Sequence, residues 1–268
     1  MSSFTARQIV ELIGQNMGVV AQNDTVDTFK SGNAATLVKS IAVTMMPTLE
    51  VLQHAAERGH NFVIAHEPAF YAHRDETGEL EGEQDEVWAR KRNFITQHNL
   101  VLWRFHDAPH LAHPDMILSG MTDELGWRAF QNPQDNRIFR LPTTTLGDLA
   151  QQIRDRLGIR CLRVVGDEKL EASRVALSPG FPGFKSQRQL LQNPEVEVLI
   201  MGEAHEWETI AYAADAGAAG LRKALLILGH TPSEQGGMKA IAHQLQALLP
   251  DVPVEFIATP EPFWMPRF

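Results

Sequence analysis

The pattern of apolar and polar residues alternates between helical and strand periodicity along the chain. Apolar residues recur at helical spacing in three segments of the first half, residues 5–18, 48–59 and 86–99. Short apolar runs typical of buried strands lie at residues 37–46, 61–67 and 100–105. This order predicts βαβ units, in which helices cover a parallel sheet. Residues 106–127 are predicted to be a loop that passes into a short helix.

The second half repeats the same alternation. Strand patterns lie at residues 136–142, 161–167, 174–180, 196–203, 223–230 and 254–259. Helical patterns lie at residues 145–158, 206–218 and 233–250. The turn-rich segment at residues 130–136 is the predicted junction of two lobes. We therefore expect an α/β fold of two related, intertwined lobes, residues 1–130 and 131–268, each a mainly parallel sheet flanked by helices.

Composition and charge narrow the function classes. The 268 residues carry a net charge of −9, which leaves no basic stripe for a nucleic-acid or anionic membrane partner. No apolar run approaches the ~20 residues that span a bilayer, and the first residues lack the pattern of a signal peptide. These features favour a cytoplasmic location. The single cysteine, Cys161, permits no internal disulfide, and we expect it in the core at the start of a strand.

Histidines and carboxylates follow three of the predicted strands. The strand at 61–67 ends in His66 and Glu67, and the strand at 100–105 is followed by His106 and, after a short loop, His110. The third set is His230, which ends the strand at 223–230, with Glu234 four residues on. Carboxyl ends of parallel strands are where an open α/β sheet gathers its functional side chains.

Imidazole and carboxylate ligands without thiolate suit zinc, iron(II) or manganese, and two such ions can activate water for hydrolysis. Each residue also has a structural interpretation. Residues 231–234, Thr-Pro-Ser-Glu, form a capping-box pattern, which taken alone favours a capping role for Glu234. Glu67 also fits a solvated strand end, and His110 a surface loop. Glu203 and His205 are further candidates, and residues 71–86 read as an acidic loop or lid.

The ordered set of motifs resembles a known family. The segments are IAHEPAFY (64–71), LVLWRFHDAPH (100–110), VLIMGEAHEW (198–207) and LLILGHTPSEQGGMKAIAHQL (225–245). They are similar to the strand ends of the Nif-three-like dinuclear metal proteins, also described as GTP cyclohydrolase type 2 homologues. The resemblance places His66, His230 and Glu234 at family ligand positions. Glu67 stands where the family usually has histidine, and His110 where it usually has aspartate.

The exchange leaves three imidazoles and two carboxylates, so the charge around two divalent ions is unchanged. The resemblance implies two lobes with the metal site in the cleft between them, His106 as a sixth ligand or supporting residue, and a ring-shaped homohexamer. We expect a metal-dependent hydrolase that uses a metal-bound hydroxide on a small-molecule substrate, with Glu203 or His106 as proton carrier. The alternative is a non-enzymatic metal-binding or scaffold protein.

Overall fold

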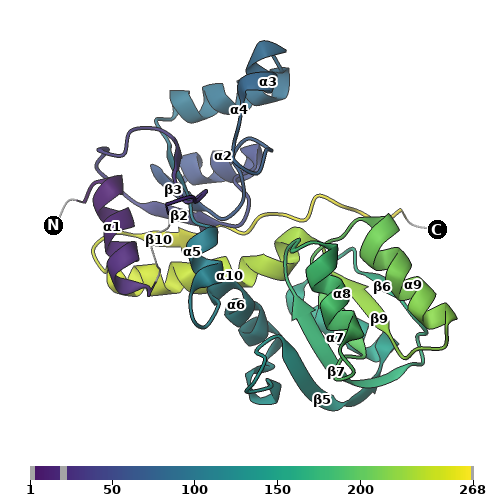
Figure 1. The fold of residues 1–268 in the computed structure, drawn as a ribbon. Helices are drawn as coiled ribbons and strands as arrows, with labels where there is room; N and C mark the ends of the chain where they lie inside the picture. The colour runs from purple at the N-terminus through teal and green to yellow at the C-terminus, as the bar shows by residue number, and fades with distance from the viewer. Residues whose placement is uncertain (1–3, 19–22, 267–268) are drawn as a thin grey trace. The chain divides into compact units, whose positions relative to one another are not determined.

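The computed structural model describes residues 4–18 and 23–266, and the chain divides into two compact units. Unit 1 comprises Met1–Met116 and Gly237–Thr259, and unit 2 comprises Ile117–Gly236 and Pro260–Phe268. Each contains a five-stranded sheet flanked by helices (Figure 1). The mixed α/β architecture predicted from the sequence is therefore confirmed. None of the helices in the described ranges is long and apolar enough to cross a membrane.

The sheet of unit 1 has the strand order β1-β4-β3-β2-β10. Its strands are β1 (Phe29–Ser31), β2 (Ile41–Thr44), β3 (Phe62–Ala65), β4 (Val101–Arg104) and β10 (Val254–Phe256). The four strands from β4 to β10 run parallel, and β1 pairs with β4 antiparallel at one edge. Every residue of β2, β3 and β4 is buried, as expected where both faces of a parallel sheet are covered.

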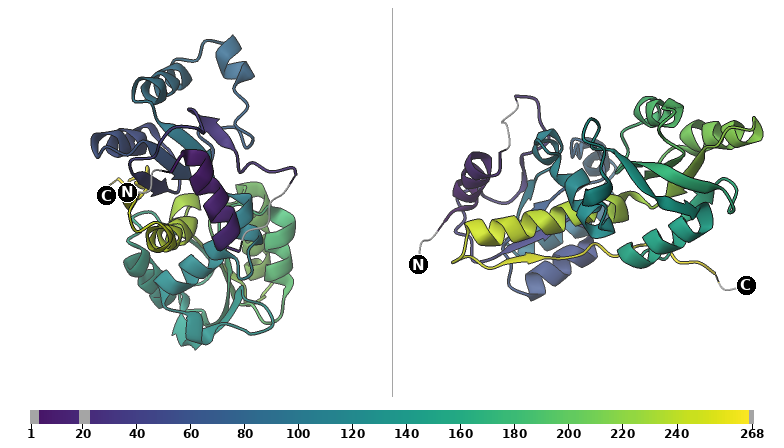
Figure 2. Two further views of the ribbon diagram at one scale, coloured as in Figure 1. Left: turned by 90° about the vertical axis from the view of Figure 1, so that its left-hand side faces the viewer. Right: turned by 90° about the horizontal axis from the view of Figure 1, so that it is seen from below.

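Helices cover both faces of this sheet (Figures 1 and 2). They are α1 (Ala6–Asn16), α2 (Leu49–Glu57), α4 (Glu86–Gln97) and the second half of α10 (His230–Leu248). Two short helices lie in the segments that follow β3 and β4: α3 (Gly78–Gly82), which has no buried residue, and α5 (Asp107–Leu111). Alternate strand residues such as Val63 and Leu102 pack with α2 and α4 in one apolar cluster. Thr48 caps α2, since its hydroxyl accepts a hydrogen bond from the N–H of Val51. The acidic stretch at 71–86 contains the short helix α3, which the sequence pattern did not indicate.

The sheet of unit 2 has the order β5-β7-β8-β9-β6. Its strands are β5 (Ile138–Thr145), β6 (Arg163–Val165), β7 (Glu171–Ser178), β8 (Val198–Met201) and β9 (Ala224–Ile227). The three central strands run parallel, and the edge strands β5 and β6 pair antiparallel. Cys161 precedes β6 and is partly exposed, so the expectation of a core cysteine was wrong.

Two helical layers also enclose the sheet of unit 2. The elements are α6 (Met116–Leu125), a 3₁₀ turn (Arg128–Phe130), α7 (Leu146–Leu157), α8 (Phe184–Gln192), a π-helical turn (Glu206–Ile210), α9 (Ala211–Ala218) and the start of α10. One apolar cluster joins α6 and α7 to one face, and a second joins α8 and α9 to the other. Gly158 ends α7 in the left-handed conformation, at the position where the helical pattern of residues 145–158 stops. The sequence pattern missed α8.

Candidate metal centre

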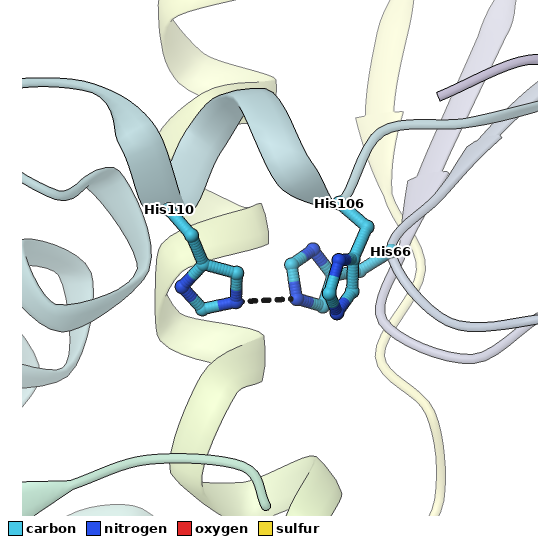
Figure 3. Close-up of side chains that lie close together, drawn as sticks. All are labelled: His66, His106 and His110. Carbon is cyan, nitrogen blue, oxygen red and sulfur yellow. Dashed lines mark hydrogen bonds between the residues drawn. The ribbon is translucent and has the colours of Figure 1, made fainter. Parts of the chain in front are cut away.

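Three histidines meet at the carboxyl edge of the unit 1 sheet. His66 directly follows β3, whereas His106 and His110 lie at the start of α5 and within it, just after β4. Ala65 and Arg104, the last residues of these parallel strands, are register partners, so the segments that follow begin side by side. One nitrogen from each imidazole lies within 4.8 Å of the other two (Figure 3). His66 is fully buried, and the other two are partly exposed.

The Nδ1 atom of each of these histidines faces an oxygen acceptor. The pairs are His66 with the carbonyl oxygen of Phe105 at 3.0 Å, His106 with Asp107 Oδ1 at 2.8 Å, and His110 with Asp115 Oδ2 at 3.3 Å. Metal-binding histidines in proteins are oriented in this way, by an acceptor at the nitrogen that does not touch the metal. In each of the three imidazoles, Nε2 is then the nitrogen that could bind a metal ion.

The Nε2 atoms of His66 and His110 approach each other to 3.2 Å. A carbonyl and a carboxylate oxygen only accept hydrogen bonds, so both imidazoles carry their hydrogen on Nδ1 when neutral. Two Nε2 lone pairs then face each other, which is repulsive unless a shared proton or a cation lies between them. The geometry of the pair therefore fits a cation that both nitrogens can bind.

Glu67 lies beside the three histidines and presents its two carboxylate oxygens in different directions. Its Oε1 is 3.8 Å from Nε2 of His106, and its Oε2 is 3.4 Å from a guanidinium nitrogen of Arg104. The side chain of Glu67 is only 11% exposed. The sequence alternative of a solvated strand-end carboxylate was therefore wrong.

The first turn of α5 is held from outside by Asp27. Its carboxylate accepts hydrogen bonds from the backbone N–H groups of His106, Asp107 and Ala108, at 2.7, 2.9 and 2.9 Å. These N–H groups have no partner within the helix and carry its positive end, so a carboxylate there stabilises the helix start. Sequence reasoning missed Asp27, because nothing local connects it to residues about 80 positions away.

Asp107 completes this support with three hydrogen-bonding partners around its carboxylate. It accepts bonds from the hydroxyl of Thr25 (2.8 Å) and the N–H of Val26 (3.0 Å), and it contacts His106. Burial alone would raise the pKa of Asp107, but these hydrogen bonds outweigh it and lower the pKa to about 2. Asp107 is therefore an ionised acceptor that orients His106.

Unit 2 holds a second group of predicted site residues around His230, the first residue of α10. Its Nδ1 lies 3.1 Å from Oε1 of Glu203, which follows β8, and its Nε2 lies 3.1 Å from Oε2 of Glu234. Glu234 is 2% exposed. Gly180, with φ of +63°, leaves room for it, since a Cβ there would lie 2.2 Å from Oε1 of Glu234. This group repeats the pattern of unit 1, with an acceptor at Nδ1.

The capping interpretation of residues 231–234 was wrong. Helix α10 begins at His230, so Thr231 lies inside the helix and cannot be its N-cap. Ser233 donates to the carbonyl of His230 at 2.7 Å and accepts from the N–H of Gly180 at 3.0 Å. Glu234 instead contacts the imidazole of His230.

His205 makes a different kind of contact. Its ring stacks on Trp207 with centroids 4.4 Å apart, and its Nδ1 lies 3.2 Å from Glu208. The side chain is 48% exposed. These contacts give His205 no carboxylate or imidazole partner from the predicted metal set.

Each of the two α/β units carries imidazoles and carboxylates at its strand ends, and the histidines of unit 1 form a group that could hold a metal ion. The chain belongs to the Duf34/NIF3 family (NGG1p interacting factor 3), whose profile matches residues 5–262. This confirms the family resemblance seen in the sequence.

Solved structures share the fold at low sequence identity. A Bacillus cereus protein related to NIF3 is 14% identical, with a TM-score of 0.75 over 99% of this chain and 100% of that chain. The protein ybgI, of unknown function, is 20% identical, with a TM-score of 0.75 over 97% and 100%. Staphylococcus aureus hypothetical protein SA1388 is 15% identical, with a TM-score of 0.74 over 98% and 100%. No curated protein matched the chain.

Proposed function

We propose that this protein binds divalent transition-metal ions through His66, His106 and His110 and uses them in a hydrolytic reaction. The observation that carries the proposal is the common orientation of the three imidazoles. Each contacts an oxygen acceptor at Nδ1, and one ring nitrogen of each lies within 4.8 Å of the other two. Histidines with a purely structural role in the core would not need to bring their ring nitrogens together in this way.

The donor set indicates which metals to expect. Imidazole nitrogens with a carboxylate nearby and no thiolate suit zinc, iron(II) or manganese. Glu67 is the carboxylate that accompanies the three histidines, with Oε1 on their side. We propose that His230 and Glu234 supply the further ligands of a centre with two ions per chain. The support for this step is their residue types, the acceptor at Nδ1 of His230, and the family resemblance.

A bound divalent ion would supply Lewis acidity that activates water near neutral pH. The side chains of the protein would then orient ligands and move protons. His106, fixed between Asp107 and Glu67, is better suited to be a ligand than a proton carrier. Glu203 has a side chain that is 50% exposed and contacts His230. It can therefore exchange protons with solvent, and we assign it the role of proton carrier.

We propose that the substrate is a small molecule and that the reaction involves neither a nucleic acid nor a membrane. Assembly into a homo-oligomer, a hexamer by resemblance, belongs to the same proposal. Light scattering of the purified protein with and without added metal would measure the oligomer directly.

The test of function has two stages. Protein prepared without chelator is loaded with Zn²⁺ or Mn²⁺ and its metal content measured, with His66→Ala as the matched variant. We expect up to two ions per chain and the loss of at least one in His66→Ala. A content that never exceeds one ion replaces the dinuclear centre with a mononuclear one. Loaded protein is then assayed on nucleotides, phosphoesters and cyclic amides. Metal binding without turnover of any of them favours the non-enzymatic alternative.

A further inference from the structure

A buried guanidinium lies directly behind the histidine cluster. Arg104, the last residue of β4, has a side chain that is 1% exposed. A buried charge is costly unless it is paired and hydrogen-bonded. A fixed cation beside a proposed cation site also repels the ions that the site would bind. Some function has to offset these two costs.

The side chain of Arg104 contacts residues 66–75, the segment that carries His66 and Glu67, two of the proposed metal ligands. Its Nε donates to the carbonyl of His66 at 2.9 Å, and one Nη donates to the carbonyl of His73. The other Nη lies 3.4 Å from Oε2 of Glu67. Asp75 lies 3.8 Å away and shares its charge between Arg104 and Lys30. The rigid fork of the guanidinium thus holds two backbone carbonyls and a carboxylate at once.

These contacts give the two carboxylate oxygens of Glu67 different partners. Oε2 faces Arg104, and Oε1 faces His106. A glutamate side chain has three rotatable bonds, so without Arg104 its carboxylate would sample several directions. With Arg104 in place, one oxygen is held toward the histidines. The positive charge of Arg104 is balanced within the same contact.

We propose that Arg104 is a positioning residue that orients Oε1 of Glu67 toward the histidine cluster. It thereby sets the affinity of the proposed metal site for divalent metal. This inference rests on the proposed function. It assigns Arg104 a role that acts through Glu67, beyond its role in holding the backbone after β3.

The test uses Co²⁺ alone as the probe, by calorimetry and by its visible absorption bands. Arg104→Lys keeps a buried positive charge but loses the fork. We expect a Kd 10- to 100-fold higher, the usual effect of losing a residue that supports a ligand, and altered cobalt bands. Lys91→Met is the matched control, because Lys91 is also a buried cation that bonds a carbonyl of this segment, that of Ala69, without touching Glu67. Its Kd and cobalt bands should match those of the natural protein.

A second background shows whether the effect passes through Glu67. In Glu67→Gln protein, Arg104→Lys should change the Kd by less than about twofold, since the aimed carboxylate is already gone. An equal effect in both backgrounds would overturn the proposal, as would an equal loss in Lys91→Met. If Arg104→Lys does not fold, Glu67→Asp carries the test. It retains Arg104 but withdraws the carboxylate by one methylene, and an unchanged Kd and spectrum there would refute the proposal. If the natural protein itself binds no Co²⁺, the proposed function fails, and not only the role of Arg104.

Discussion

The buried amine of Lys91 makes a pH-dependent prediction that needs no metal. The side chain lies on α4 and the residue is 3% exposed. Its Nζ donates to the carbonyl of Ala69 and lies 5.1 Å from the ring centroid of Tyr71. Burial lowers the pKa of Lys91 from 10.5 to about 8, although Asp75 partly counteracts this.

The folded-state pKa lies below the unfolded value, which fixes the sign. Between about pH 8 and pH 10.5 the unfolded chain holds a proton on Lys91 that the folded chain has released, so stability rises with pH. Each tenfold difference in proton affinity corresponds to about 1.4 kcal/mol, which makes the full effect about 3 kcal/mol. Lys91→Met lacks this contribution. At pH 7 the Lys91→Met variant avoids the cost of burying a charge. This gain is offset because the carbonyl of Ala69 loses its donor, at a cost of about 1–3 kcal/mol.

Urea denaturation of metal-free protein measures the effect at pH 7, 8, 9 and 10. Other alkaline titrations are common to both proteins and cancel in the comparison. The free energy of unfolding of the natural protein should rise relative to that of Lys91→Met by about 2 kcal/mol or more between pH 7 and pH 10. Parallel curves across this range would show that Lys91 keeps an ordinary pKa, and the assignment of Lys91 as a buried, desolvated amine would be wrong.

Three further predictions concern the candidate ligands and their support. Glu234→Gln should retain the fold, measured by its thermal midpoint, but lose metal by elemental analysis; retained metal would withdraw Glu234. Gly180→Ala should lower the free energy of unfolding more than Gly158→Ala does in denaturation. Both glycines have φ near +65°, but only a Cβ at position 180 would contact Glu234. Equal losses of stability would show that the Glu234 side chain moves aside at little cost. Asp107→Asn should lose about 1 kcal/mol at pH 7, and the difference should vanish as the pH falls from about 4 to 2, since the lowered pKa of Asp107 stabilises the fold only while it is ionised.

The periodicity of apolar residues predicts most of the helices and strands of the fold. The elements that it missed carry too weak a signal in their own sequence. The strands β2, β3 and β4 are buried at every position and apolar at all but the last residue of β2 and of β4, as expected of a sheet covered on both faces. The antiparallel edge strand β1 was missed, because its three residues, Phe29–Ser31, are too few to show a period. Helix α8 was missed for a different reason. Gly183 precedes it without a side-chain cap, so no start signal marks it.

The residues of the candidate site could be predicted as proposed ligands, but the residues that support them could not. His66, His106 and His230 stand out because each ends an apolar run, which is a local signal. Asp27 and Asp115 contact this group from a distant segment and from a short loop, and nothing in their own sequence context predicts those contacts. Arg104 closes an apolar strand, where its charge suggests an exposed residue, and only the structure shows it buried.

The exchange of ligand types at Glu67 and His110 yields the last prediction. In the resemblance, histidine and aspartate stand at these two positions, so Glu67→His with His110→Asp restores that order. Each single change has its own cost in the structure. Glu67→His removes the carboxylate from Arg104, and His110→Asp places a carboxylate beside Asp115, which now lies 3.3 Å from the imidazole. Divalent ions would relieve the second cost by balancing the added charge.

We therefore expect each single variant to bind metal more weakly and the double variant to recover part of the loss. Coupling of about 0.5–3 kcal/mol in metal binding is the range for residues that share a site. Recovery should stay incomplete, because among the residues that the structure describes only Asp75, at 3.8 Å, then remains as a charged partner of Arg104. Calorimetric titration with Mn²⁺ of all four proteins gives the cycle. Strictly additive losses would show that Glu67 and His110 act on different ions or on none. The two departures from the family pattern would then be independent substitutions rather than one exchanged pair of ligands.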